Sequence, residues 1–178
     1  MTKSLLLAGF GGQGILFAAK QIAALGMDLG KNVTWLPSYG PESRGGTSNC
    51  SVIISDEEIG SPIVNRPDCL VVFNLPSFDK FINAVAPGGE VFIDSTLVSR
   101  ECERDDIKAH YIPATGLAAE NGIEGSANVI MLGKIIAETG LFERDEFLAH
   151  MAAGIPATRA HLIERNNKAF DIGYYYNK

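Results

Sequence analysis

The segment Gly9-Phe10-Gly11-Gly12-Gln13-Gly14 decides the fold that this sequence predicts. It follows a short apolar run, Lys3 to Ala8, that is typical of a β-strand. It precedes a stretch from Ile15 to Leu29 in which apolar side chains recur at helical spacing. Asn32 to Leu36 is then predicted to form a second strand that ends at Pro37. The order strand, glycine turn, helix, strand is a βαβ opening, which implies a parallel sheet with a right-handed crossover.

The remaining strands are predicted further along the chain. Thr47 to Ile54 follows the second strand without an intervening helix, so we expect antiparallel or irregular pairing there and hence a mixed sheet. The other apolar runs that fit strands are Cys69 to Phe73, Glu90 to Asp94 and Ala109 to Ile112. Pro113 to Gly116 follows the last of these and is expected to join the residues at the carboxyl-terminal edge of the sheet.

Helices are predicted from their start and stop signals. Gly30 is expected to end the first helix with a positive φ, and Pro76 to open a second one. The helical stretches in the last third are Ser126 to Thr139 with Gly140 after it, Glu143 to Ala153, and Thr158 to Asp171 with Gly173 beyond it. The sequence therefore predicts an α/β fold: one three-layer αβα domain over residues 1–178, with a mostly parallel, mixed sheet.

Composition narrows the class of protein. The chain of 178 residues is 46% hydrophobic with a net charge of −6, which argues against nucleic acid or an anionic membrane surface as the main partner. No apolar run approaches the ~18 residues that a membrane span needs. Cys50, Cys69 and Cys102 are far apart without a C-x-x-C pair, so a disulfide framework, a zinc site and a four-cysteine cluster all lack support. We expect free thiols, no metal bound by this chain and a cytoplasmic protein.

The glycine segment fits the pattern G-x-G-x-x-G of phosphate-binding turns. Its glycines allow a tight turn and a close approach of backbone N–H groups to a ligand, and the following helix N-terminus favours an anion. A dinucleotide site also needs an acid about 20 residues on, at the end of the second strand. Val33 to Ser38 contains none. The turn can therefore bind a phosphate, pack within the fold or contact a partner chain.

A second dense segment is Ser38-Tyr39-Gly40-Pro41-Glu42-Ser43-Arg44-Gly45-Gly46. The Arg44 guanidinium has the forked geometry that suits a carboxylate or phosphate, although an ordinary surface loop fits equally. Asn74 and Asp94-Ser95-Thr96 likewise follow predicted strands. If those strands are parallel, all of these residues gather at one carboxyl-terminal edge, where open α/β sheets bind their ligands.

Together these segments resemble the gamma subunits of 2-oxoacid:ferredoxin oxidoreductases. Tyr-Gly-Pro-Glu-Ser-Arg-Gly-Gly placed about 25 residues after Gly-Gly-Gln-Gly is a specific combination. The stretch Trp35 to Ile54 looks closer to 2-oxoglutarate and branched-chain types than to pyruvate types. Further similar motifs are Ile59-Gly60-Ser61-Pro62, Arg66-Pro67-Asp68, Asn128 with Leu132-Gly133, and Asn167 to Gly173-Tyr174.

The resemblance implies a subunit that cannot perform the redox chemistry alone. The complex would oxidatively decarboxylate a 2-oxoacid with coenzyme A, giving an acyl-CoA and CO₂, and pass electrons to ferredoxin. Thiamine diphosphate, Mg and 4Fe-4S clusters would belong to other subunits, because this chain lacks a Gly-Asp-Gly motif and cluster cysteines. Expected partners are the alpha, beta and ferredoxin-like delta subunits of the same complex, and the isolated chain is expected to form a homodimer.

No residue is assigned a catalytic role. The alternatives are a free-standing NAD(P)- or flavin-binding enzyme and a non-enzymatic α/β scaffold module. The residues expected at a cofactor-binding site or interface are Gly9, Gly11, Gly12, Gln13, Gly14, Tyr39, Pro41, Glu42, Arg44, Gly45, Gly46, Asn74 and Asn128.

Overall fold

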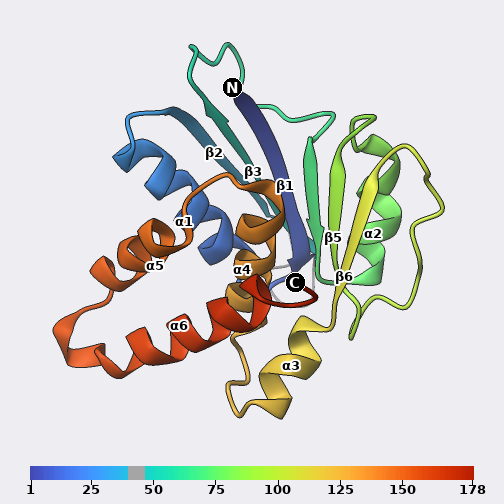
Figure 1. Cartoon of the computed structure of the whole chain (residues 1–178). Coiled ribbons are helices and arrows are strands. Elements are labelled where there is room, and N and C mark those ends of the chain that lie inside the picture. Colours follow the sequence, from blue (N-terminus) through green and yellow to red (C-terminus); the bar gives the residue numbers. More distant parts are fainter. Residues whose placement is uncertain (40–46) are drawn as a thin grey trace. The chain divides into compact units, whose positions relative to one another are not determined.

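The computed structural model describes residues 1–39 and 47–178 (Figure 1). The chain divides into two compact units, Met1–Tyr111 and Ile112–Lys178, and each is described by itself. A single domain over residues 1–178 therefore stays a prediction. No helix in the described part of the chain is long and apolar enough to cross a membrane.

The first unit is built on a mixed sheet, which in the described part of the chain has six strands. They are β1 (Thr2–Phe10), β2 (Asn32–Tyr39), β3 (Thr47–Ser55), β4 (Cys69–Val72), β5 (Glu90–Asp94) and β6 (Lys108–Ile112), in the order β2-β3-β1-β4-β5-β6. β1, β4 and β5 are parallel, whereas β3 runs antiparallel to both of its neighbours, β1 and β2. The predicted mixed sheet is confirmed.

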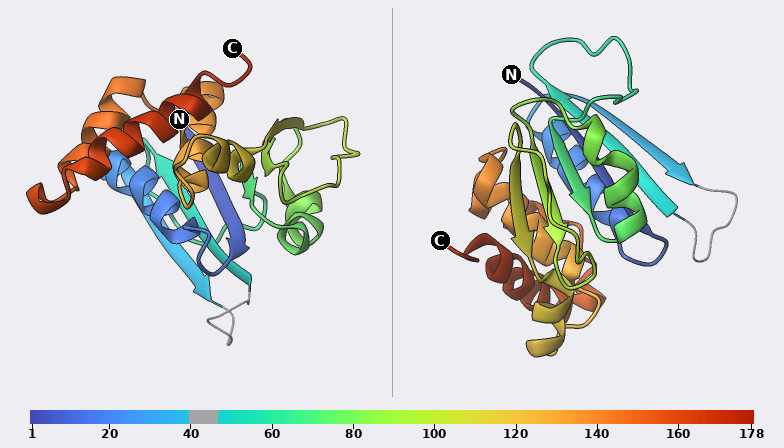
Figure 2. Two further views of the ribbon diagram at one scale, coloured as in Figure 1. Left: turned by 90° about the horizontal axis from the view of Figure 1, so that it is seen from below. Right: turned by 90° about the vertical axis from the view of Figure 1, so that its right-hand side faces the viewer.

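Helices cover both faces of this sheet (Figure 2). α1 (Ile15–Asp28) lies on the face that carries Ile54, because a Cβ on Gly26 would lie 3.3 Å from the Ile54 Cδ1 atom. α2 (Leu75–Phe81) lies on the face of Leu6, which shares a buried cluster with Phe78. Ile54 pairs with Lys3, three positions before Leu6 in β1, so these two faces are opposite. The predicted three-layer architecture is confirmed.

The predicted end of the second strand is wrong. β2 continues through Pro37 to Tyr39 instead of stopping at Leu36. Pro37 lacks a backbone N–H, but β2 is an edge strand in the described sheet, where alternate N–H groups need no partner strand. A proline that would end a central strand is therefore tolerated here.

The second unit is helical. Its helices are α3 (Ala114–Glu120), α4 (Ala127–Thr139), α5 (Arg144–Ala153) and α6 (His161–Tyr174); the short 3-10 turns of the chain are η1 (Ile82–Ala84) and η2 (Ala157–Arg159). Pro113 to Gly116 follows β6 as predicted, with Pro113 at the N-cap of α3. One prediction is wrong: Thr158 lies in η2 and does not cap the last helix. Gly140 ends α4 with a φ of 59°, as predicted.

Two glycines set the packing of α4 against α6. A Cβ on Gly173 would lie 1.7 Å from the Ile130 carbonyl oxygen, and one on Gly133 would lie 2.0 Å from the Phe170 carbonyl oxygen. The two helix backbones therefore touch where each lacks a side chain. This contact explains why Gly173 lies inside α6 and not beyond its end.

We expect Gly173→Ala to destabilise the protein by about 3 kcal/mol, because the new methyl group must push α4 and α6 apart. Helix propensity alone predicts the opposite sign, a gain of about 1 kcal/mol. Urea unfolding measures the difference. The control is Gly154→Ala, whose Cβ would make an ordinary contact of 3.6 Å with the Met151 oxygen; equal stability of both variants would contradict the close-packing account.

A partly buried hydrogen bond joins β5 and β6. The His110 Nε2 atom lies 2.8 Å from the Glu90 Oε2 atom, and the imidazole is stacked on Phe92 with 4.5 Å between ring centroids. His110 is only 6% exposed. This hydrogen bond is the main cause that lowers the pKa of Glu90, with a further contribution from Lys3.

The lowered pKa of Glu90 predicts a pH dependence of stability. Because the folded pKa lies below the unfolded value of about 4.3, ionised Glu90 stabilises the fold above that pH. The contribution is lost as the pH falls through the folded pKa. The difference in unfolding free energy between the wild-type protein and Glu90→Gln should therefore shrink from pH 6 to pH 3. Glu58→Gln, at an exposed position, should follow the wild-type protein throughout.

Candidate functional site

The carboxyl-terminal edge of the sheet gathers several of the predicted site residues. Because β1, β4 and β5 are parallel, Gly9, Asn74 and Asp94 lie at or directly after strand ends on the same edge. β2 and β1 are both antiparallel to β3, so Tyr39 ends β2 at this edge too, paired with Ser48. The backbone of these segments therefore gathers at one edge of the sheet, as the sequence predicts.

The junction between β1 and β4 is a topological switch point. The two strands are parallel neighbours, yet β1 leads into α1 on one face and β4 leads into α2 on the other. In open α/β sheets the two loops that follow such strands turn to opposite faces, and ligands bind in the crevice between these loops. The glycine turn is one of these loops, and Phe73-Asn74 is the other.

Gln13 bridges the two loops. Its Oε1 atom accepts a hydrogen bond from the Phe10 N–H at 2.7 Å, and its Nε2 atom donates to the Phe73 carbonyl oxygen at 3.0 Å. Gly9 leaves room for this side chain, because a Cβ there would lie 2.5 Å from the Gln13 Oε1 atom. Sequence reasoning assigned Gln13 to a ligand or partner, but its amide oxygen and nitrogen both bond within the chain.

The start of α1 has the electrostatic character of an anion site. Gly12 and Gly14 adopt φ values of 94° and 74°, which disfavour any residue with a side chain. Gly14 is the N-cap position, and among the described residues no side chain caps the helix there and no acid lies in its first turn. The positive end of the helix dipole therefore lies at this edge. Gly11 and Gly12 are exposed.

Asn74 has a structural task at this edge. Its Oδ1 atom accepts a hydrogen bond from the Ser77 N–H at 2.8 Å and so caps α2. The residue is 3% exposed, and its Nδ2 atom and the Ser77 hydroxyl have no hydrogen-bond partner in the part of the chain that the structure describes. Nearby, the buried Asp94 accepts from the Thr96 N–H at 3.1 Å. Sequence reasoning missed this capping role of Asn74, although asparagine directly before a helix is a capping signal.

The other predicted residues belong to the second unit or lie outside the described residues. Asn128 lies in the first turn of α4 in the second unit, where its Oδ1 atom accepts from the Val129 N–H at 3.0 Å. The predicted site residues Pro41, Glu42, Arg44, Gly45 and Gly46 lie outside the described residues.

The cysteines do not fit an iron–sulfur cluster, which thiolates hold. Burial raises the pKa of the Cys50 thiol to about 12 and also raises the pKa of Cys69, so both favour the neutral thiol. Within residues 1–39 and 47–178, no three His, Cys, Asp or Glu side chains are grouped so as to hold a metal ion.

Comparison with known proteins identifies the class to which this fold and edge belong. The family described as pyruvate ferredoxin/flavodoxin oxidoreductase matches residues 4–176. The chain therefore belongs to this family, and the resemblance drawn from its motifs is confirmed.

Individual relatives agree with this assignment. The chain is 44% identical over 171 residues to ketoisovalerate oxidoreductase subunit VorA of Methanothermobacter thermautotrophicus, covering 94% of this chain but only 35% of that relative. It is 35% identical over 177 residues to 2-oxoglutarate synthase subunit KorC of Methanocaldococcus jannaschii, covering 98% and 93% of the two chains. The solved gamma subunit of a keto/oxoacid ferredoxin oxidoreductase from Geobacter sulfurreducens has a TM-score of 0.83 at 27% identity, covering 98% and 95%.

We expect Gln13→Ala to cost about 2 kcal/mol, because the Phe10 N–H and the Phe73 carbonyl oxygen both lose their partner. Amide hydrogen exchange at Phe10 should accelerate as the bridge between the two loops is lost. Gln21→Ala in α1 is the matched control and should change stability by less than about 0.5 kcal/mol. Equal effects of the two substitutions would show that the bridge contributes nothing specific.

Proposed function

We propose that the chain is the gamma-type part of a complex that oxidatively decarboxylates a 2-oxoacid. The complex uses coenzyme A, forms an acyl-CoA and CO₂, and passes electrons to ferredoxin. The observation that carries this proposal is the family match over residues 4–176, together with the nearly full-length likeness to a 2-oxoglutarate synthase subunit. The ketoisovalerate and 2-oxoglutarate relatives support a 2-oxoglutarate or branched-chain 2-oxoacid as substrate.

This chain assists assembly of the complex and forms part of the surroundings of its active site. The start of α1 and the glycine turn supply backbone N–H donors and the positive end of a helix dipole, and the sequence adds the guanidinium of Arg44. They suit either a carboxylate of a partner subunit or a phosphate of coenzyme A. Coenzyme A supplies the thiol that accepts the acyl group, and the glycine turn and Arg44 would hold its phosphates.

The remaining cofactors belong to other subunits in this proposal. Thiamine diphosphate, Mg and 4Fe-4S clusters are assigned to alpha, beta and ferredoxin-like delta chains, because the described cysteines of this chain do not suit a cluster. The acidic composition and scattered cysteines support a cytoplasmic complex. The isolated chain would expose its interface, which favours a homodimer.

The alternatives have less support. A free-standing NAD(P) or flavin enzyme would need a ribose-binding acid at the end of β2, and residues 32–39 contain none. A scaffold module without a catalytic partner is at odds with the subunit relatives.

The test is gentle anaerobic purification of the tagged chain from its native host. We expect thiamine-binding and iron-containing chains to co-purify, with reduction of an electron acceptor that depends on a 2-oxoacid and coenzyme A. Recovery of the chain alone or with unrelated partners would overturn the proposal.

We expect Arg44→Ala to weaken assembly or to raise the coenzyme A concentration needed for half-maximal activity by about tenfold, the loss expected for one charge-assisted contact. Arg159→Ala is the matched control, because Arg159 is exposed in η2. If Arg44→Ala behaves like the control in both assays, Arg44 is not the polar anchor.

A further inference from the structure

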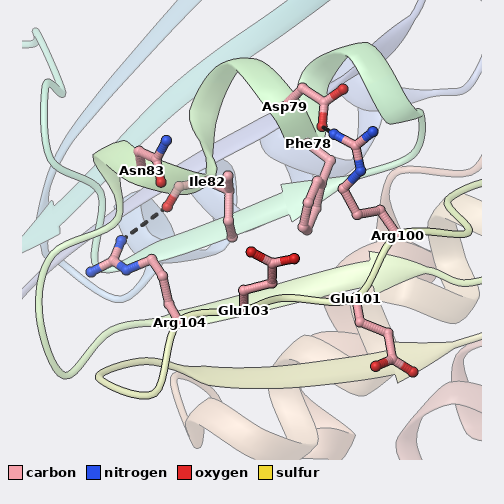
Figure 3. A pocket seen from close by; sticks show the side chains of 8 residues that line it. All are labelled: Phe78, Asp79, Ile82, Asn83, Arg100, Glu101, Glu103 and Arg104. Carbon is pink, nitrogen blue, oxygen red and sulfur yellow. Dashed lines mark hydrogen bonds and ion pairs between the residues drawn. The ribbon is translucent and has the colours of Figure 1, made fainter.

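A pocket of about 360 Å³ lies between α2 with η1 and the irregular segment 98–107 of the first unit (Figure 3). Phe78 and Ile82 supply apolar atoms, and the rest of the lining is mainly charged. The volume is near the lower limit of about 300 Å³ for small-ligand sites. It suits one long side chain rather than a nucleotide.

The two arginines of the pocket are already engaged. Arg104 donates to the carbonyl oxygens of Ile82 at 2.9 Å and Val85 at 2.8 Å, and its other nitrogens bind the Asp106 carboxylate at 2.8 and 2.6 Å. Arg100 forms an ion pair with Asp79. Each arginine thus has its own carboxylate, and Arg104 also has main-chain acceptors, so the pocket has little capacity for an anion.

The carboxylate of Glu103 has no ion-pair partner among the described residues. Glu103 points into the pocket between Arg100 and Arg104, whereas Glu101 points away from it (Figure 3). Within the described part of the chain, no hydrogen bond or ion pair to the Glu103 carboxylate is present. The pocket therefore combines a negative group with the apolar side chains of Phe78 and Ile82.

We propose that this pocket binds a lysine or arginine side chain of a partner protein, a site beyond the carboxyl-terminal edge of the proposed function. The aliphatic stem packs on Ile82 and Phe78, and the cationic end binds the Glu103 carboxylate. Charge complementarity supports a basic partner, because Arg100 and Arg104 are paired with Asp79 and Asp106, which leaves the Glu103 carboxylate in excess, and the whole chain carries a net charge of −6. The exposed rim, which includes Glu101 and Glu103, leaves the pocket open to a side chain that arrives on a protein surface.

The test is an NMR titration of the 178-residue chain, followed through the Ile82 methyl groups. The probes are N-acetyl-lysine methylamide and N-acetyl-arginine methylamide, and the uncharged control is N-acetyl-norleucine methylamide. We expect saturable shifts with the two cationic probes only. Glu103→Gln should weaken binding about tenfold, the loss expected for one charge-assisted hydrogen bond. Glu101→Gln, the matched control on the same rim, should leave binding within about twofold.

Three outcomes would overturn the proposal: no saturable shift, equal binding of the norleucine compound, or equal weakening by Glu101→Gln and Glu103→Gln. Cadaverine serves as a free amine that lacks a peptide backbone. If it alone bound in the micromolar range, the pocket would be a small-amine site and the partner side chain would be excluded. None of these measurements uses the oxidoreductase complex, so their failure is distinguishable from failure of the proposed function.

Discussion

The amide of Gln13 fixes the spatial relation on which the candidate site depends. It binds the Phe10 N–H in the glycine turn and the Phe73 carbonyl oxygen at the end of β4, two loops separated by 60 positions in the chain. Because the Phe10 N–H and the Phe73 carbonyl oxygen both bond to the Gln13 side chain, the two loops are held in a fixed relative position before any ligand binds. The arrangement requires glycine at position 9, since a Cβ there would lie only 2.5 Å from the Gln13 Oε1 atom.

Most of the fold follows from local patterns in the sequence. The apolar runs, the glycine turn and the helix stop signals predict the strands β1, β3, β4, β5 and β6 and the helices α1, α2, α4 and α5 to within a few residues. Glycine shows where such reasoning fails. Gly30 and Gly140 end helices with positive φ, whereas Gly133 and Gly173 lie within helices and allow them to touch. The residue type is the same, and only the tertiary contact decides its use.

The edge at which the candidate residues gather was predictable from the sequence, whereas their hydrogen bonds were not and their role as a site stays a prediction. Sequence reasoning places the glycine turn, Tyr39 and Asn74 after strands, and the parallel pairing of β1, β4 and β5 brings these ends to one edge. It could not show that Gln13 and Asn74 bond within the chain, because those bonds depend on which strands are neighbours. Residues 40–46, which include Arg44, lie outside the described residues.

The position of β3 has a consequence for the evolution of cofactor use in this fold. In a dinucleotide-binding unit, the strand after the first helix lies directly beside the first strand, so that its terminal acid reaches the ribose. Here the antiparallel β3 lies between β1 and β2, which places the end of β2 about 10 Å from β1, twice the usual spacing of neighbouring strands. An aspartate introduced at Pro37 or Ser38 would be a full strand too distant. The strand order therefore keeps an acid at the end of β2 too far from the glycine turn to bind the ribose of a dinucleotide. A point substitution in β2 cannot create that site.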